Sequence, residues 1–179
     1  RRLALGKGSK TLAEARSALG IAELANLPIP FTRKGPARQM PSFRCEAVVL
    51  TTPGRAPLPG WLFTPSAVTN ATPMLILNGE GKKAAAKQVS RGLDAGRAVL
   101  AVDLSGVGET CGSPHKFYGA PNKDEELAVM AYALGDSLAR IRAEDVLIAA
   151  RWLGTACAAA PVEVCCSGWD VTPVRLASM

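Results

Sequence analysis

Two glycine-rich turns hold residues of this sequence that are well placed to do chemistry. The turn Asn78-Gly79-Glu80-Gly81 follows the apolar run Met74–Leu77, and the turn 105–109 follows the apolar run Ala98–Val102. Both runs are short and unbroken, which is typical of parallel strands buried on both faces. Open α/β sheets place their ligand chemistry at the carboxyl ends of such strands. The two turns therefore indicate where a site should be sought.

The first of these turns also resembles part of a nucleotide-binding loop. A phosphate-binding loop needs G-x-x-x-x-G-K-[ST], but Lys83 occupies the Ser/Thr position and no glycine lies five residues before Gly81. A dinucleotide-binding fold needs G-x-G-x-x-G and an acid at the end of the next strand. Asp103 suits the acid, but Ala84 replaces the third glycine. We therefore predict no nucleotide and no other cofactor.

The only histidine, His115, lies in the long segment 104–122 after the second apolar run. Compact domains rarely tolerate so long a loop without a function, so His115 could contact a substrate or be merely structural. The five cysteines show no C-x-x-C and no other metal spacing, and we predict no metal site. Their odd number favours reduced thiols and hence a cytoplasmic setting, and no signal peptide is visible.

Hydrophobic periodicity and turn residues predict the elements that position these turns. The expected order is helix 11–25, strands 45–51, 58–64 and 74–77, helix 83–95, strand 97–103, a helical stretch 123–153 broken at Gly135, strand 162–166, turn 167–171 and helix 172–179. Two buried strands separated by a helix predict an α/β fold, a three-layer αβα sandwich with a mostly parallel sheet. The acids Glu144-Asp145 and Asp124-Glu125-Glu126 are expected on solvated helix faces or at helix N-termini.

Residues 1–41 are predicted to be a basic leader before a folded domain at 42–179. Thr11 and Glu14 have capping-box spacing, and four prolines in 27–41 favour an extended linker. Residues 1–44 carry a net charge of +7 and the remainder −1, which favours a solvated linker over a polyanion-binding arm. Only Phe31 and Phe43 lie among those charges, so no nucleic-acid partner is expected. No apolar run is long enough to span a membrane.

This order of elements resembles the first half of the α/β-hydrolase fold, in particular the acetyl xylan esterase-like hydrolases. The matching segments are 58–65, 96–103, 106–110 and 142–153, and the resemblance covers residue 42 to the last residue. The leader resembles the linker before a second hydrolase-like domain in large members. The resemblance implies an N-terminal portion of the fold, whose open sheet edge would be covered by a partner chain, a homo-oligomer mate or a longer parent.

The resemblance also places a nucleophile on the turn after the strand 162–166, in a G-x-S-x-G frame. Here the frame is Gly168-Trp169-Asp170-Val171-Thr172, with Asp in place of Ser and Thr172 in place of the second glycine. Three interpretations remain open: the turn has lost catalysis and Asp170 caps the next helix, Asp170 is a carboxylate nucleophile, or Ser167 is a displaced nucleophile. Trp169, within the frame, is a candidate substrate contact.

In the same family, the turn at Asn78 and Gly79 would supply an oxyanion-hole amide, and the acid and histidine would follow later strands. His115 precedes the nucleophile frame, which is the wrong chain order for the triad base. We therefore predict a hydrolase-like domain related to carboxylic-ester hydrolases, without a complete triad in this chain. The alternative is an active hydrolase whose remaining triad residues lie in a partner chain or longer parent. Its substrate would be an acylated carbohydrate or small ester.

Overall fold

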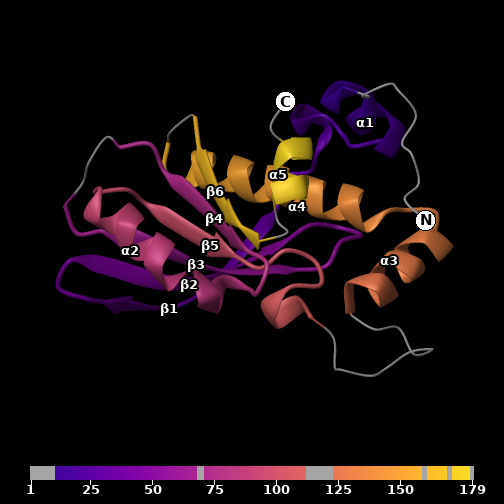
Figure 1. Cartoon of the computed structure of the whole chain (residues 1–179). Helices are drawn as coiled ribbons and strands as arrows, with labels where there is room; N and C mark the ends of the chain where they lie inside the picture. The colour runs from indigo at the N-terminus through magenta and orange to yellow at the C-terminus, as the bar shows by residue number, and fades with distance from the viewer. Residues whose placement is uncertain (1–10, 68–70, 112–122, 159–160, 169–170, 178–179) are drawn as a thin grey trace.

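The computed structural model describes residues 11–67, 71–111, 123–158, 161–168 and 171–177. One six-stranded sheet runs through them in the order β1-β2-β3-β5-β4-β6 (Figure 1). The strands are β1 (Phe31–Gln39), β2 (Phe43–Thr51), β3 (Leu58–Pro65), β4 (Met74–Asn78), β5 (Val99–Val102) and β6 (Glu163–Ser167). The α-helices are α1 (Leu12–Leu19), α2 (Ala86–Asp94), α3 (Lys123–Ala133), α4 (Leu138–Ala156) and α5 (Val171–Ala177). Three 3₁₀ turns complete the described elements: η1 (Leu24–Asn26), η2 (Lys82–Ala85) and η3 (Gly108–Thr110).

The two apolar runs of the sequence are parallel neighbours in this sheet. Leu75 of β4 lies opposite Leu100 of β5, and β6 pairs with the other side of β4 in the same direction. β3 is antiparallel to β5, β2 to β3, and β1 to β2. Four strands, β2, β5, β4 and β6, therefore point the same way. The predicted α/β fold is confirmed.

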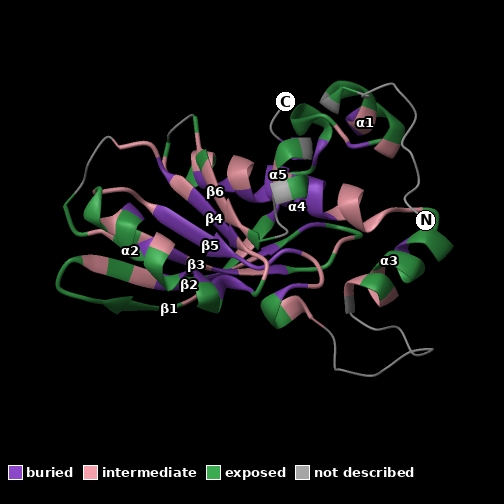
Figure 2. Cartoon of the chain, viewed as in Figure 1, coloured by how far each residue is buried: buried purple, intermediate pink, exposed green. Residues whose placement is uncertain are grey.

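Helices cover both faces of the central strands, as the alternation of side chains requires. One face of β4 and β5 joins the larger core beneath α4, which includes Leu75, Leu77, Leu100 and Val102. The other face carries Ile76, Val99 and Ala101 and packs against Val89 of α2. Figure 2 shows these central strands as the most buried part of the molecule. Fully burying each large aliphatic side chain contributes about 1.5–3 kcal/mol.

The structure differs from the predicted linker at residues 27–41. Residues 31–39 are extended, as predicted, but they pair with β2 as a strand of the sheet. The register shifts between Lys34 and Ala37, which is where Pro36 lies. An edge strand tolerates proline at such an irregularity because no ladder hydrogen bond is lost there. The prolines that favoured a linker are thus compatible with an edge strand.

The first helix is shorter than predicted and packs on the rest of the chain. The capping box of Thr11 and Glu14 is formed, but α1 ends at Gly20, which has a φ of 64°. Arg16 is buried, and its guanidinium donates to the carbonyl of Ala177 at 3.3 Å. The described part of the leader is therefore attached to α5 and is not a solvated linker.

The charges of α4 are buried, which corrects the prediction of a solvated face. Arg142, Glu144 and Asp145 are 4%, 1% and 1% exposed. The loop after β5 covers two of them: Ser105 donates its backbone N–H to Asp145 at 2.9 Å and accepts from Arg142 at 2.9 Å. Arg142 also pairs with Asp124 of α3 at 2.7 Å. Burial raises the pKa of Asp145 and outweighs the bonds from Ser105.

Glu144 fixes the leader and the β2–β3 turn to α4. Its carboxylate accepts from the backbone N–H of Ala22 at 2.9 Å and from Arg140 at 3.3 Å, and it pairs with Arg55. Burial raises the pKa of Glu144, but these hydrogen bonds and the Arg55 charge outweigh it, so the pKa lies below its ordinary value. The sequence could not reveal this role because the partners lie 89 and 122 residues away.

Helices α3 and α4 confirm the predicted break at Gly135. Gly135 has a φ of 77°, and the side chain of Ser137 caps α4 by accepting from the N–H of Arg140. None of the helices in the described ranges is long and apolar enough to cross a membrane.

Candidate functional site

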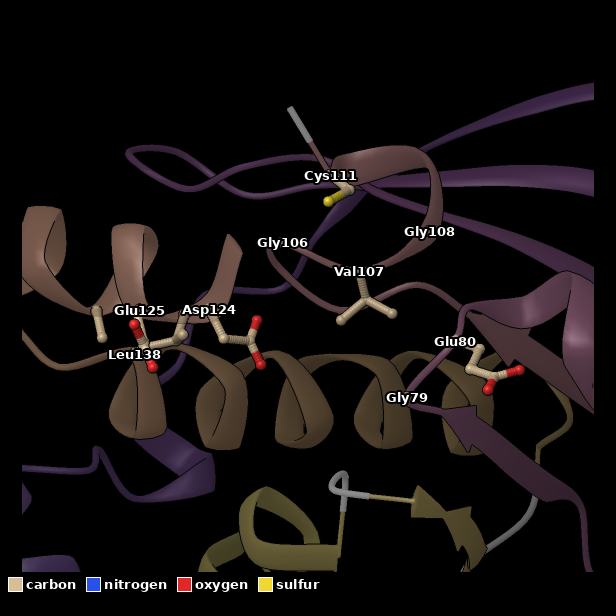
Figure 3. Close-up of a pocket in the computed structure, with 10 residues that line it drawn as sticks. Gly79, Glu80, Gly106, Val107, Gly108, Cys111, Asp124, Glu125 and Leu138 are labelled. Carbon is tan, nitrogen blue, oxygen red and sulfur yellow. The ribbon is translucent and has the colours of Figure 1, made fainter. Parts of the chain in front are cut away.

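An open cavity of about 960 Å³ lies at the carboxyl ends of β4 and β5. The two glycine-rich turns of the sequence form one side of it, through Gly79 and Glu80 after β4 and residues 106–108 after β5. Asp124 and Glu125 at the start of α3 line the other side (Figure 3). The sequence predicted the two turns at strand ends, and the structure brings them to one cavity.

A buried ion pair joins the two turns behind this cavity. The Nζ of Lys82 lies 2.6 Å from an Oδ of Asp103, and both residues are almost fully buried. Asp103 also accepts from the backbone N–H of Lys82 at 2.6 Å and of Glu109 at 3.0 Å. The Glu109 carboxylate is the second partner of the Lys82 ammonium, at 3.0 Å. We call Lys82, Asp103 and Glu109 the clamp, because they hold the turn after β4 to the loop after β5.

Two glycines let the clamp close. Gly108 has a φ of 55°, and a Cβ at this position would overlap the Asp103 carboxylate. Gly81 has a φ of 96°, and its Cβ would lie 2.9 Å from the Cα of Gly108. Only glycine combines a positive φ with so close a backbone approach. The spacing of Gly81-Lys82 and Asp103-x-x-x-x-Gly108 thus serves an ion pair, and Lys82 is directed at a carboxylate of its own chain.

The backbone N–H groups of the turn after β4 already donate hydrogen bonds within the protein. The Oδ1 of Asn78 accepts from the N–H of Glu80 at 2.9 Å, and the carbonyl of Asn78 accepts from Gly81 at 2.7 Å. The N–H of Gly79 donates to the carbonyl of Ser167 at 3.2 Å. The predicted oxyanion role of Asn78 and Gly79 stays a prediction, and any oxyanion would compete with these bonds.

The turn after β6 lies next to the turn after β4. Ser167 is the register partner of Asn78, and its half-buried Oγ lies 3.5 Å from the Nε2 of Gln88. Gly168 follows with a φ of 76°. A Cβ built on Gly168 would lie 3.8 Å from the backbone of Gly79. Ser167, Asn78 and Gly79 are therefore neighbours. Asp170, Trp169 and His115 lie outside the described residues, and their roles stay predictions.

Solved esterase structures match this arrangement of strands and helices. An acetyl xylan esterase from Paenibacillus sp. R4 matches with a TM-score of 0.58 and 19% identity over 92% of this chain. A protein from Bacteroides fragilis NCTC 9343 assigned to the acetyl xylan esterases matches with a TM-score of 0.67 and 16% identity, also over 92%. The chain has the fold of the N-terminal portion of an α/β hydrolase. The predicted resemblance to acetyl xylan esterase-like hydrolases is confirmed for the fold.

The α/β-hydrolase-like chain spans about half the length of these structures. It covers 52% of the Paenibacillus esterase and 49% of the Bacteroides protein. It likewise covers 51% of a glucuronoyl esterase from Solibacter usitatus, with 88% of this chain aligned, a TM-score of 0.52 and 13% identity. No protein-family profile and no curated protein sequence matches the chain, so the likeness rests on three-dimensional structure.

Two carboxylates at or near the cavity are held in ion pairs. Asp124 pairs with Arg142, and Asp103 is held in the clamp. Within the described ranges, no group of three or more His, Cys, Asp or Glu side chains could hold a metal ion. Burial raises the pKa of the Cys45 thiol, which Arg38 partly offsets, and burial also raises that of Cys157, so neither thiol favours the nucleophilic thiolate.

Proposed function

We propose that this chain is an α/β-hydrolase-like module, related to carboxylic-ester hydrolases, that does not hydrolyse esters with its own residues. The observation that carries the proposal is the bond from the Gly79 N–H to the Ser167 carbonyl at 3.2 Å. An oxyanion hole needs backbone donors aimed at the developing negative charge and free to receive it. In this chain, the N–H of Gly79 is the donor at the expected position, and it is already hydrogen-bonded to the last residue of β6.

The residues after β6 support the same proposal. The nucleophile frame contains Asp170 where an esterase of this fold has serine, and Thr172 where the turn needs its second glycine. Small flanking residues matter because the strained strand-to-helix turn leaves little room for side chains. A frame with Thr172 in place of the second glycine is poorly suited to a catalytic elbow. Asp170 precedes α5, where a carboxylate stabilises a helix start.

The clamp explains how the scaffold persists without catalysis. Lys82 and Asp103 are charged residues beside the cavity, and each satisfies the other inside the fold. Their burial gives the turn after β4 a defined geometry that requires no substrate. We therefore assign these polar residues to the stability of the hydrolase-like module.

A second candidate function is ester hydrolysis, with acylated carbohydrates or small esters as substrates. The neighbouring positions of Ser167 and the Asn78–Gly79 turn favour it, because an attacking oxygen and an amide donor must lie close together. Ser167 or Asp170 would attack the acyl carbon, and a partner chain or longer parent would supply the remaining triad residues. A base is essential because a neutral serine hydroxyl is a weak nucleophile.

Covalent trapping distinguishes the two functions. The protein, with Ser167→Ala and Asp170→Ala variants, would be treated with a fluorophosphonate probe and assayed for p-nitrophenol release from p-nitrophenyl acetate. An active acetyl xylan esterase provides the positive control. We expect no adduct on residues 167–170 and the same background release from all three proteins. An adduct mapped to Ser167, or an acyl adduct on Asp170, would overturn the proposal, as would turnover that either substitution abolishes.

A further inference from the structure

One face of the molecule carries a cluster of exposed cations. Arg33 and Arg38 lie on the edge strand β1, and Lys83, Lys87 and Arg91 lie on η2 and α2. All five residues are exposed. We call these five residues the basic surface.

Strand register places the two arginines on the α2 side of the sheet. Arg38 lies opposite Cys45 of β2, which lies opposite Phe63 of β3. Phe63 in turn lies opposite Val99 of β5, and both belong to the core beneath α2. Directly opposite residues share a face, so Arg38 lies on the face that α2 covers farther along.

Arg33 reaches the same face by the same argument. It lies opposite Val49, which lies opposite Pro59 of β3. Pro59 and Phe63 are four residues apart on one strand, and even separations keep side chains on one face. The two arginines therefore lie on the same face of the sheet as α2, on the edge strand, with β2 and β3 between β1 and β5 (Figure 1).

The three cations of η2 and α2 form a stripe along the helix. Lys83, Lys87 and Arg91 recur every four residues, which places them on one side of a helix. Ala85 and Val89 lie on the buried side and enter the core. The stripe therefore points to solvent while the apolar side of the helix packs on the sheet.

The basic surface is not neutralised by carboxylates of the described residues. Other cations of the hairpin are paired: Lys34 and Arg44 both contact Glu46, which belongs to the opposite face of the sheet. None of the five basic-surface residues has a carboxylate within ion-pair distance in the described ranges. Asp94 at the end of α2 is exposed and is the only acidic residue of η2 and α2. Uncompensated charge of one sign raises the local concentration of oppositely charged partners.

Apolar side chains lie on the same face as the arginines and favour a protein partner over a nucleic acid. Phe31, opposite Thr51 on the same face, is 73% exposed, and Ala47 is exposed as well. Arginine and aromatic residues together are typical of protein interfaces. Surfaces that bind single-stranded nucleic acids usually present several rings free for stacking. Phe43 and Phe63 are half-buried and pack edge to face on each other, with centroids 5.9 Å apart.

We propose that the basic surface binds an acidic segment of a partner protein, whose carboxylates reach both β1 and the α2 stripe. This inference does not depend on whether the turn after β6 is catalytic, because no basic-surface residue belongs to that turn. Arginine suits the role since its guanidinium can bind a carboxylate through two parallel hydrogen bonds.

Binding of fluorescent poly-L-glutamate, measured by anisotropy at low salt, tests the proposal. The Lys83→Ser/Lys87→Ser/Arg91→Ser variant should weaken binding about tenfold, and Arg33→Ser/Arg38→Ser somewhat less, because each exposed pair contributes modestly. The control Arg1→Ser/Arg2→Ser/Lys7→Ser removes the same charge from the leader and should change binding less than about threefold. Added salt should weaken binding of the unmodified protein.

Three results would overturn the inference. Equal losses in the control and the α2 variant would show that net charge alone drives binding. Tighter binding of a single-stranded oligothymidine, with the same dependence on the five residues, would indicate a nucleic-acid surface. Absence of poly-L-glutamate binding would remove the premise. If the variants fail to fold, carbodiimide cross-linking of poly-L-glutamate to the unmodified protein must yield adducts at Lys83 or Lys87, and adducts only at other lysines would contradict the proposal.

Discussion

The clamp and the turn after β6 hold their polar groups very differently. In the clamp, Asp103 accepts from three donors, and the side chains of Lys82 and Asp103 are about 1% exposed. At the turn after β6, Ser167 is half-buried, and within the described ranges its Oγ has one long hydrogen bond, 3.5 Å, from Gln88. A hydrolase would need strict positioning at the second place, where a nucleophile attacks. In this chain, the strictly positioned polar groups are those of the clamp, where they stabilise the fold.

The difference teaches that residue types associated with chemistry can satisfy one another inside the fold. A buried lysine and aspartate beside a cavity resemble a functional pair. Their mutual distance of 2.6 Å and the glycines packed against them instead indicate a closed structural unit. The four predictions below test whether the polar groups of the clamp, of α4 and of the turn after β6 are structural, beginning with the largest expected effect.

Asp103→Asn should destabilise the protein by about 3–5 kcal/mol, because it leaves the buried Lys82 ammonium without its main partner. The double variant Lys82→Met/Asp103→Leu should cost less than Asp103→Asn alone, since no uncompensated charge stays buried. Urea unfolding followed by circular dichroism measures both. A double variant less stable than the single one would show that the ion pair itself supplies net stability.

Gly108→Ala should destabilise the fold by about 2–5 kcal/mol, combining the cost of a positive φ with overlap on the Asp103 carboxylate. Gly54→Ala is the matched control, because Gly54 also has a positive φ, 73°, but nothing lies within 4 Å of its Cβ position. The control should cost only about 1–2 kcal/mol. Equal losses in thermal or urea unfolding would mean that crowding at the clamp is unimportant.

Glu144→Gln should cost about 1.5–3 kcal/mol at neutral pH, because its bonds to Arg55 and Arg140 lose their charge. The folded pKa of Glu144 is lowered, so its contribution to stability is present above the ordinary glutamate pKa and is lost as pH falls through the folded value. The difference between the variant and the unmodified protein should therefore shrink below about pH 4.5. Urea unfolding across a pH series measures it.

Asp145→Asn is a neighbouring control with the opposite sign. The folded pKa of Asp145 is raised by burial, so ionisation costs the folded state stability as pH rises through the ordinary aspartate pKa. The unmodified protein should gain stability relative to this variant on acidification, while it loses stability relative to Glu144→Gln. Parallel pH profiles for the two variants would contradict the assigned causes.

The sequence predicted the strands and helices more reliably than the interactions between them. Short apolar runs and the break at Gly135 depend on local patterns, and the structure contains both. The strand at 31–39 was missed because an edge strand can carry a proline that a central strand cannot. The buried roles of Lys82 and Glu144 were missed because their partners come from other elements of the chain. Local sequence contains no record of such pairings.

The candidate site was predicted in position and only partly in composition. The turns after β4 and β5 do meet at a cavity, as the rule for parallel strand ends implies. The bond that uses the Gly79 N–H could not be foreseen, because it depends on the register between β4 and β6. Register follows from packing of both strands against the helices, which no single segment specifies.

Ser167→Ala should have the smallest effect and is the sharpest comparison with the clamp. Among the described residues, the Oγ of Ser167 has one hydrogen-bond partner, the Nε2 of Gln88 at 3.5 Å, so its removal should change the free energy of unfolding by less than about 0.5 kcal/mol. Its backbone carbonyl, which accepts from Gly79, is unchanged by the substitution. Ester turnover should also be unchanged, which distinguishes a structural turn from a nucleophile. A loss of turnover with unchanged stability would indicate that Ser167 is a nucleophile and not a structural residue.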